Sequence, residues 1–258
     1  MLIQYEQGFG DSIQFLRYVE QIKPLAKKII FRTRDKLLDL LKINLNGFEV
    51  IGQSLPIEEL QFDYHIPLMS LPKVLNSKID NIPLAQGYIK ADAKKTEEYK
   101  KNFFDNDYFK IGISWNGTEG GSQKRSIPLE LFYPLTKMKN TKVYSFQKGL
   151  GSGQLELLPP NVEIVDLGNT FDDFSDTAAA MSNLDLFITS DNGNLNLAGA
   201  MGKKAFLLLT QYPDWRWFFD EETTPWYNSV KIFKQANEND GWEPVMQRAF
   251  KELETLLR

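Results

Sequence analysis

The chain has 258 residues, of which 42% are hydrophobic and 25% are charged. A chain of this length can bury a substantial core and form one large domain or two smaller ones. It has no cysteine and a single histidine, His65, which excludes disulfides, thiolate metal sites, cysteine nucleophiles and multi-histidine zinc sites. The formal net charge of −4 argues against a general nucleic-acid-binding protein, so no nucleic-acid partner is expected.

The sequence also lacks the signals of membrane insertion and export. No apolar run approaches the roughly 18 residues of a membrane span, so no transmembrane segment is expected. The first residues, Met1–Tyr5, lack the basic n-region and the long apolar h-region of a signal peptide. We therefore expect a cytoplasmic protein, for which contact with a membrane surface stays open.

Short apolar runs alternate with amphipathic stretches along the chain, which is typical of a parallel α/β architecture. In the first part, four strands are expected, at residues 2–5, 28–32, 48–51 and 64–67. A turn at 8–10 leads into a helix that begins at Asp11 or Ser12, either of which is a suitable N-cap. A second helix is expected at 35–43, and the charged stretch 93–107 is expected to form a helical crossing.

The second part of the chain continues the same alternation. Six strands are expected, at residues 110–115, 142–147, 162–166, 186–189, 205–209 and 230–233. Four helices are expected, at residues 127–138, 173–182 and 194–201 and near the C-terminus. Gly202 is expected to cap the C-terminal end of the third of these helices.

This order of elements predicts an α/β fold with two Rossmann-like domains that face a cleft. We assign residues 1–92 to an N-terminal domain, 93–108 to the crossing and 109–258 to a C-terminal domain. The last helix could pack back on the N-terminal domain. Ligands of such sheets bind beyond the carboxyl ends of the strands, so the cleft between the two domains is the expected site.

The segment Glu6–Ser12, with the sequence EQGFGDS, joins the first strand to the first helix. Gly8 and Gly10 allow a tight turn and let a ligand approach the backbone closely. Asp11 at the helix start could take a proton from a sugar hydroxyl, or it could only cap the helix. The third glycine of a dinucleotide-binding motif is missing. This segment alone therefore does not distinguish a catalytic Asp11 from one that only caps the helix.

The segment Ser190–Asn194, with the sequence SDNGN, follows the strand expected at 186–189. A strand, a polar turn and a helix start leave backbone N–H groups available to a phosphate or diphosphate. An ordinary strand-to-helix turn would show the same pattern. The glycine-rich segment Trp115–Ser126 ends in two adjacent cations, Lys124 and Arg125, which could neutralise a diphosphate or could belong to a solvated loop.

Two further segments carry alternatives of the same kind. His65 stands near the end of an expected strand and could be structural or catalytic. Aromatic residues in Pro213–Trp217 and Pro225–Tyr227 could stack on a base or sugar, or could pack the domains together around an Asp–Arg salt bridge. Asp172 and Asp173 are expected to start a helix, and no Asp-x-Asp turn or other metal site is expected.

Taken in order, these segments resemble a known family. Glu6–Tyr18 resembles the opening of a glycosyltransferase domain that often follows tetratricopeptide repeats in bacterial proteins. That domain is similar to glycosyltransferase family 9, the ADP-heptose:lipopolysaccharide heptosyltransferases. Four more segments fit the same domain, namely Phe62–Pro72, Arg125–Leu129, Leu197–Gly202 and Pro213–Trp217. The resemblance covers essentially the whole chain, although no tetratricopeptide repeats precede the domain and Met1 directly abuts the first strand. The chain is therefore either a stand-alone form or a piece of something longer.

The resemblance implies a GT-B fold, two Rossmann-like domains with the donor held mainly by the second. It implies an inverting, metal-independent glycosyltransferase that needs no cofactor. A sugar would pass from a nucleotide-sugar donor to a hydroxyl of a glycan, a lipid-linked or lipopolysaccharide-type acceptor, or a protein. Asp11 would be the general base, Lys124 would contact a phosphate, and Asp191–Gly193 would contact the donor sugar and phosphates. The donor-binding residues would be Gly8, Gly10, Trp115, Asn116, Lys124, Arg125, Gln147, Lys148, Asp191, Asn192, Gly193 and Asn196.

Two positions depart from the family's pattern. Asn192 replaces the usual threonine, and Asn196 stands where the family has a histidine three residues after the glycine of the turn. Asparagine donates a hydrogen bond but carries no positive charge, so it would stabilise a phosphate less well. Three functions therefore stay open: a glycosyltransferase, a non-catalytic nucleotide-sugar-binding module, and a sugar-nucleotide epimerase of the same fold.

Overall fold

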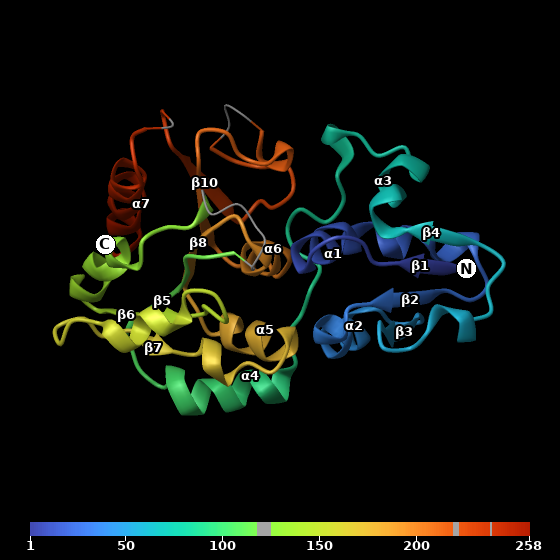
Figure 1. The fold of residues 1–258 in the computed structure, drawn as a ribbon, viewed down its shortest axis with the longest axis horizontal. Coiled ribbons are helices and arrows are strands. Elements are labelled where there is room, and N and C mark those ends of the chain that lie inside the picture. Colours follow the sequence, from blue (N-terminus) through green and yellow to red (C-terminus); the bar gives the residue numbers. More distant parts are fainter. Residues whose placement is uncertain (118–124, 219–221, 238) are drawn as a thin grey trace.

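The computed structural model describes residues 1–117, 125–218, 222–237 and 239–258. Two separate parallel sheets form its frame (Figure 1). The first sheet has the strand order β3–β2–β1–β4. Its strands are β1 (Leu2–Gln4), β2 (Ile30–Thr33), β3 (Glu49–Gly52) and β4 (His65–Pro67). Ile3 of β1 pairs in parallel register with Phe31 of β2 and Ile66 of β4.

The second sheet is the larger one and has the strand order β10–β9–β8–β5–β6–β7. Its strands are β5 (Phe109–Ser114), β6 (Thr141–Ser145), β7 (Val165–Asp166), β8 (Leu186–Ser190), β9 (Ala205–Leu209) and β10 (Val230–Lys234). This is the strand order of a dinucleotide-binding Rossmann sheet, in which the order reverses between β5 and β8. The expected α/β class with two parallel sheets is confirmed.

The first helix, α1 (Phe9–Phe15), follows β1 with Gly8 as its N-cap. It therefore begins before Asp11 and Ser12, and the prediction that one of these residues is the N-cap is wrong. Asp11 is the third residue of the helix and accepts the Gly8 N–H at 2.8 Å, so its carboxylate caps the helix from within. The chain continues as the 3₁₀ helix η1 (Leu16–Leu25). The other helices of this half are η2 (Asp35–Leu37), α2 (Leu38–Asn44), η3 (Ile57–Glu59), η4 (Leu68–Ser70), α3 (Leu71–Val74) and η5 (Ile79–Asn81).

The crossing between the two sheets is helical, as predicted. It consists of α4 (Ala93–Tyr99), which continues as one stretch of π-helix, η6 (Lys100–Phe104). The second half contains η8 (Leu129–Lys137), η9 (Ser152–Leu157), η10 (Gly168–Thr170), α5 (Phe174–Ser182), α6 (Gly193–Ala200), η11 (Trp215–Trp217) and α7 (Glu243–Leu256). No helix in these described stretches is both long and apolar enough to cross a membrane.

Three features of the second half can be set against what the sequence predicted. Gly202 follows α6 with a φ of 67°, which is the left-handed conformation expected of a helix C-terminal cap. The helix expected at 127–138 is a 3₁₀ helix, because Pro134 in its interior has no N–H to donate to an α-helical ladder. The C-terminal helix α7 packs against β9, β10 and η8 of its own half, so it does not return to the N-terminal domain.

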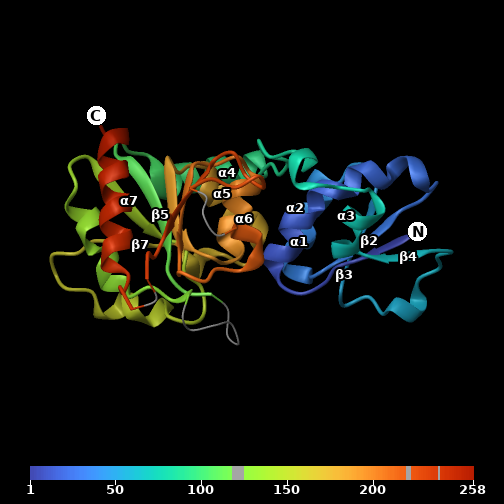
Figure 2. The same ribbon diagram turned by 90° about the horizontal axis from the view of Figure 1, so that it is seen from above.

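Helices α5 and α6 lie between the second sheet and the first half of the molecule (Figure 2). Helix α6 contacts α1, and helix α5 contacts α2. One apolar core consequently runs from Phe31 in the first sheet to Phe187 and Leu207 in the second. A second core fills the other face of the larger sheet, under α7 and η8.

A buried arginine crosses the boundary between the two halves. Arg17 is 1% exposed, and its guanidinium donates to the carbonyl oxygens of Trp226 at 2.7 Å and Pro83 at 3.3 Å. Its Cζ atom lies 4.8 to 5.4 Å from the ring centres of Tyr88, Trp226 and Tyr227. Carbonyl dipoles and ring faces thus stabilise a charge that would be costly to bury alone.

The contacts of Asp176 predict how its substitution changes the stability of the fold. Its carboxylate accepts from Lys95 Nζ at 2.7 Å and from the Asp172 N–H at 2.8 Å, so it joins α4 to the start of α5. Burial opposes its ionisation, but the Lys95 ammonium and the backbone donors outweigh burial and lower the pKa of Asp176. We expect Asp176→Asn to reduce the free energy of unfolding by about 1–2 kcal/mol at pH 7.

The direction of the pKa shift of Asp176 determines how the stability difference between the two proteins depends on pH. Because the folded-state pKa of Asp176 lies below its ordinary value of 3.8, the carboxylate stabilises the fold above that value and loses its effect as the pH falls further. Urea unfolding of both proteins should therefore converge at low pH. Asp107→Asn, at an exposed position, is the control and should change little. An equal difference at all pH values would contradict the assigned role of the charge.

Candidate functional site

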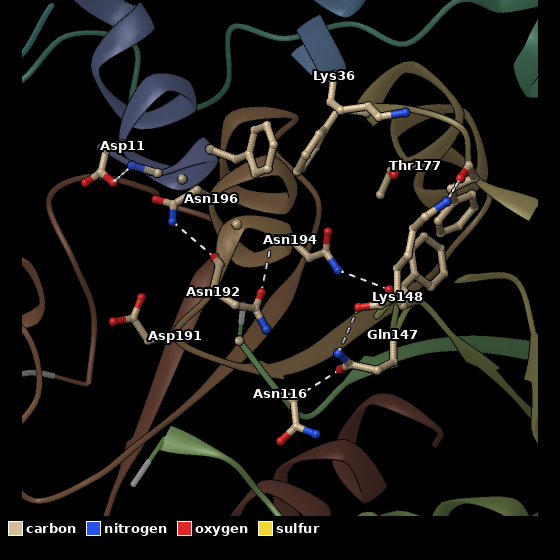
Figure 3. A pocket seen from close by; sticks show the side chains of 18 of the residues that line it. Asp11, Lys36, Asn116, Gln147, Lys148, Thr177, Asp191, Asn192, Asn194 and Asn196 are labelled. Atoms are coloured by element: carbon tan, nitrogen blue, oxygen red, sulfur yellow. Dashed lines mark hydrogen bonds between the residues drawn. The ribbon is translucent and has the colours of Figure 1, made fainter. Parts of the chain in front are cut away.

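A cavity of about 470 Å³ lies between α1 and the carboxyl ends of β5, β6 and β8 (Figure 3). This is the point at which the strand order of the second sheet reverses, where such sheets bind their ligands. Its walls contain most of the residues predicted from the sequence, namely Gly8, Gly10, Asp11, Asn116, Arg125, Gln147, Lys148, Asp191, Asn192, Gly193 and Asn196. Trp115 is fully buried and is not part of the wall, and Lys124 lies outside the described residues.

The side chain of Asp11 links the two halves of the molecule at this cavity. One of its oxygens accepts the Gly8 N–H, and the other accepts the guanidinium of Arg216, which lies in η11 after β9. Arg216 also pairs with Asp214 at 2.9 Å. The Asp11 and Arg216 side chains are only 15% and 14% exposed, so the pair is largely shielded from water. Asp11 can therefore cap α1 and still face the cavity, because each carboxylate oxygen can accept more than one hydrogen bond.

Asn192 holds the turn between β8 and α6 in place. Its Oδ1 accepts the N–H groups of Asn194 at 3.0 Å and Leu195 at 3.2 Å, which caps α6. Its Nδ2 donates to Thr189 Oγ1 at 2.8 Å and Ser114 Oγ at 3.1 Å. The amide therefore has its hydrogen-bonding capacity engaged by the protein, and its contribution to the cavity is the orientation of the helix start.

Asp191 is buried beside the same turn. It forms an ion pair with Arg125 across 3.2 Å. Burial raises the pKa of Asp191, and the Arg125 charge opposes that effect. Arg125 thus lies at the cavity, and its guanidinium already has one anionic partner.

Gln147 organises the loop that follows β5. Its Oε1 accepts the N–H groups of Trp115 at 3.0 Å and Asn116 at 2.9 Å, and its Nε2 donates to the Leu150 carbonyl at 2.9 Å. The side chain is 3% exposed. The amide therefore joins the ends of β5 and β6, and Asn116 is presented to the cavity by this contact (Figure 3).

Asn196, which stands where the family pattern has a histidine, is also engaged inside the protein. Its Oδ1 accepts the Tyr227 hydroxyl at 2.9 Å, and its Nδ2 donates to the Asn192 carbonyl at 3.2 Å. A Cβ atom at Gly10 would lie 2.7 Å from Asn196 Nδ2, so a glycine is needed where α1 meets α6. Asn196 thus packs the two helices together at the edge of the cavity.

Several residues of the cavity were not found from the sequence. One of these is Lys36, which reaches across from the first half and donates to the Asp172 carbonyl at 2.9 Å. Lys148, by contrast, is among the predicted residues, and it donates to the Phe171 carbonyl. Other members of the wall outside the prediction include Gln14, Phe146, Phe174, Thr177 and Asn194. Lys36 could have been found, because it follows the end of β2, whose carboxyl end faces the cleft. The others carry no local signal that separates them from ordinary helix and loop residues.

The remaining segments singled out from the sequence lie elsewhere. His65 is exposed on β4 and does not line the cavity. Trp217 and Trp226 are buried, and Trp226 contributes to the packing around Arg17. Arg216 pairs with Asp214, so the geometry of this segment matches domain packing around an Asp–Arg salt bridge. Within the residues that the structure describes, no group of three or more His, Asp or Glu side chains could hold a metal ion.

Comparisons with known proteins agree with this architecture. No model of a protein family matches the sequence. The protein FlbA of Caulobacter vibrioides is 26% identical in an alignment 275 residues long, gaps included. The alignment covers 96% of this chain and 45% of FlbA, so the chain spans about half the length of that relative.

Solved structures of similar fold cover nearly the whole chain. A glycosyltransferase family 9 protein from Veillonella parvula has a TM-score of 0.70 at 16% identity, with 99% of this chain and 96% of that chain covered. The ADP-heptose lipopolysaccharide heptosyltransferase II of E. coli has a TM-score of 0.71 at 14% identity, with 99% and 98% covered. The dodecameric glycosyltransferase TibC of E. coli, described as iron-containing, has a TM-score of 0.64 at 12% identity, with 100% and 77% covered. The chain therefore has the GT-B fold of glycosyltransferase family 9 structures, as the sequence resemblance implied.

The hydrogen bonds of Gln147 predict that its substitution lowers the stability of the fold, which can be measured without any ligand. Gln147→Met leaves the buried N–H of Trp115 without its acceptor, so we expect a loss of about 1–3 kcal/mol in the free energy of unfolding. Gln147→Glu keeps an acceptor for the two N–H groups and should lose less at neutral pH. Urea unfolding measures both variants. Equal stability of the Met variant and the wild type would contradict this role.

Proposed function

We propose that this chain is an inverting, metal-independent glycosyltransferase that uses a nucleoside diphosphate sugar as donor. One observation carries the proposal. A single cavity brings Asp11, on the first helix of one half, to the start of α6 and the switch point of the Rossmann sheet in the other half. A carboxylate suited to proton removal thus faces a place suited to a diphosphate.

The donor's diphosphate fits the second-half side of this cavity best. The positive end of α6 lies there at Gly193, and Asn192 fixes the direction of this helix start by accepting the N–H groups of Asn194 and Leu195. Arg125 and Lys148 also line this side and supply cationic charge to a leaving diphosphate. Lys124 remains predicted to contact a phosphate. In this proposal Asn192, Gln147 and Asn196 act mainly by holding the backbone that meets the donor.

Asp11 would act on the acceptor. It would take the proton from an acceptor hydroxyl as that oxygen forms a bond to the anomeric carbon of the donor sugar. The bond from that carbon to the diphosphate breaks on the opposite face, which inverts the configuration. Arg216 would hold the Asp11 carboxylate in its orientation during this step.

The donor class is supported by the proteins of the same fold. One of them is named for ADP-heptose, so ADP-linked sugars are the first donors to test. The acceptor class covers glycans, lipid-linked or lipopolysaccharide-type sugars and proteins. The proposal includes a cytoplasmic location, which suits a chain without cysteine.

A second candidate function is a nucleotide-sugar-binding module without turnover. The engagement of Asn196 by Tyr227 and Asn192 favours it, because the side chain at the family's histidine position is not free for a phosphate. The Asp11–Arg216 ion pair points the same way, because the carboxylate is already engaged within the protein.

The central test is Asp11→Asn. Loss of a general base should reduce transfer by about 100-fold or more, while the asparagine oxygen can still accept the Gly8 N–H. Transfer is measured by mass spectrometry with ADP-, GDP-, UDP- and CMP-sugars, and donor binding by thermal shift. Ligand at 100 times its dissociation constant should add about 2.7 kcal/mol of stability in wild type and variant alike.

Asp63→Asn, at an exposed position of the first half, is the matched control and should keep full activity. Unchanged transfer by the Asp11 variant would reject Asp11 as the base. Donor binding by wild type without transfer to a broad acceptor panel would establish the binding module instead. No thermal shift with any donor would reject both functions.

Metal independence is a separate prediction. Transfer should continue at the same rate after dialysis against EDTA, because the charge on the diphosphate would be neutralised by Arg125, Lys148 and the start of α6 rather than by a cation. TibC, a glycosyltransferase of similar fold, is described as iron-containing, so iron and magnesium should each be added back in turn. Loss of activity on chelation, restored by either metal, would contradict this prediction.

A further inference from the structure

Gln14 is a polar residue of the cavity wall whose side chain has no hydrogen-bond partner among the residues that the structure describes. Its side chain is 0% exposed, and neither its Nε2 nor its Oε1 makes a hydrogen bond among the described residues. A buried amide without partners is destabilising, because it gives up its hydrogen bonds to water. An apolar side chain of the same size would avoid that penalty, so packing alone does not explain a glutamine here.

The free amide lies beside the proposed general base. Gln14 follows Asp11 by three residues on α1, which puts both side chains on the same face of the helix, about 5–6 Å apart at their Cβ atoms. The main chain at this point is held firmly, since the Gln14 carbonyl accepts from Arg17 Nε at 3.0 Å and from the Tyr88 hydroxyl at 3.2 Å. The backbone from which the Gln14 side chain extends is therefore fixed relative to that of Asp11.

The neighbouring polar side chains of the wall do not satisfy it. The carboxylate of Asp11 is engaged by Gly8 and Arg216, and the amide of Asn196 is engaged by Tyr227 and Asn192. Of the described wall residues, Arg216 alone shares the feature, with an unpartnered buried Nε. The unmet hydrogen-bonding capacity of the cavity thus gathers around Asp11, away from the switch point.

The chemistry of the amide selects its ligand. Gln14 can donate through Nε2 and accept through Oε1 at the same time. A phosphate at neutral pH mainly accepts hydrogen bonds, so it would leave Oε1 unpaired. Neighbouring hydroxyl groups of a sugar both donate and accept, so they satisfy both atoms.

We propose that Gln14 binds a hydroxyl of the acceptor sugar next to the hydroxyl that Asp11 deprotonates, and so selects acceptors with two neighbouring hydroxyl groups. This inference rests on the proposed glycosyltransferase function and adds the acceptor's recognition element to it. A nucleobase could also pair with a glutamine amide, but the base lies at the far end of the donor from the reacting carbon. Contact with the base would change donor affinity, whereas contact with the acceptor would not.

The test compares Gln14→Met with wild type, because methionine keeps the length of the side chain and removes the amide. The donors are ADP-sugars, and the acceptors are methyl glycosides of glucose, galactose, mannose and a heptose. We expect the KM for the glycoside to rise about 10-fold or more, with the KM for the donor unchanged within about twofold. The temperature of thermal unfolding without ligand should not fall, because the variant loses no internal hydrogen bond. Gln21→Met, at an exposed position of the following helical segment η1, is the matched control and should change neither KM.

A second measurement does not depend on the folding of the variant. Wild-type protein should lose a similar factor with a monodeoxy glycoside that lacks the hydroxyl next to the attacking one, and Gln14→Met should lose nothing further with that glycoside. Transfer by wild type with no change in acceptor KM in the variant, or an equal loss with every monodeoxy glycoside, would overturn the role of Gln14 and leave the proposed function intact. A rise in the donor KM alone would assign Gln14 to the donor instead. No transfer by wild type to any glycoside would reject the inference together with the proposed function.

Discussion

The close approach of α1 and α6 is the contact on which the cavity depends. These helices come from different halves of the chain, and each begins directly after a strand whose carboxyl end faces the cleft. A Cβ atom at Gly10 would lie 3.5 Å from the Cα of Gly193 and 2.7 Å from Asn196 Nδ2. The two helix starts can meet this closely only because a glycine stands at position 10, and their meeting brings Asp11 to the turn after β8.

Buried polar groups then hold this arrangement. Arg17 carries its charge into the boundary between the halves, where backbone carbonyls and three aromatic rings surround it. Arg216 pairs with Asp11 from the other side, and Lys36 reaches the Asp172 carbonyl. Separating the halves would leave these charges without their partners, which is more costly than losing apolar contacts alone. The distance between Asp11 and the turn after β8 is thereby restricted.

Most polar side chains of the cavity serve the protein's own structure. Asn192 caps a helix, Gln147 clamps a loop and Asn196 joins two helices. Such residues set the direction of backbone N–H groups, so they can shape a binding site without touching its ligand. Gln14 differs from them because its amide is buried and has no partner in the described part of the chain, and this difference is what points to a ligand.

The sequence by itself determined the secondary elements, their parallel α/β order and the turns that meet at the cavity. These features depend on local periodicity, on glycines and on capping residues, so they can be read from neighbouring positions along the chain. Asp11, Asn116 and Asp191 were found in this way, because each follows the end of a strand. Only the tertiary structure decided the packing of α7 on its own sheet, the partners of Arg216 and Asn196 and the isolation of the Gln14 amide. Those outcomes depend on which distant surfaces pack together, and burial and hydrogen bonding across such contacts leave no periodic trace in the sequence. The turn between β1 and α1 and the turn between β8 and α6 were expected to face the same cleft, and the packing of their two helices decides how closely they approach.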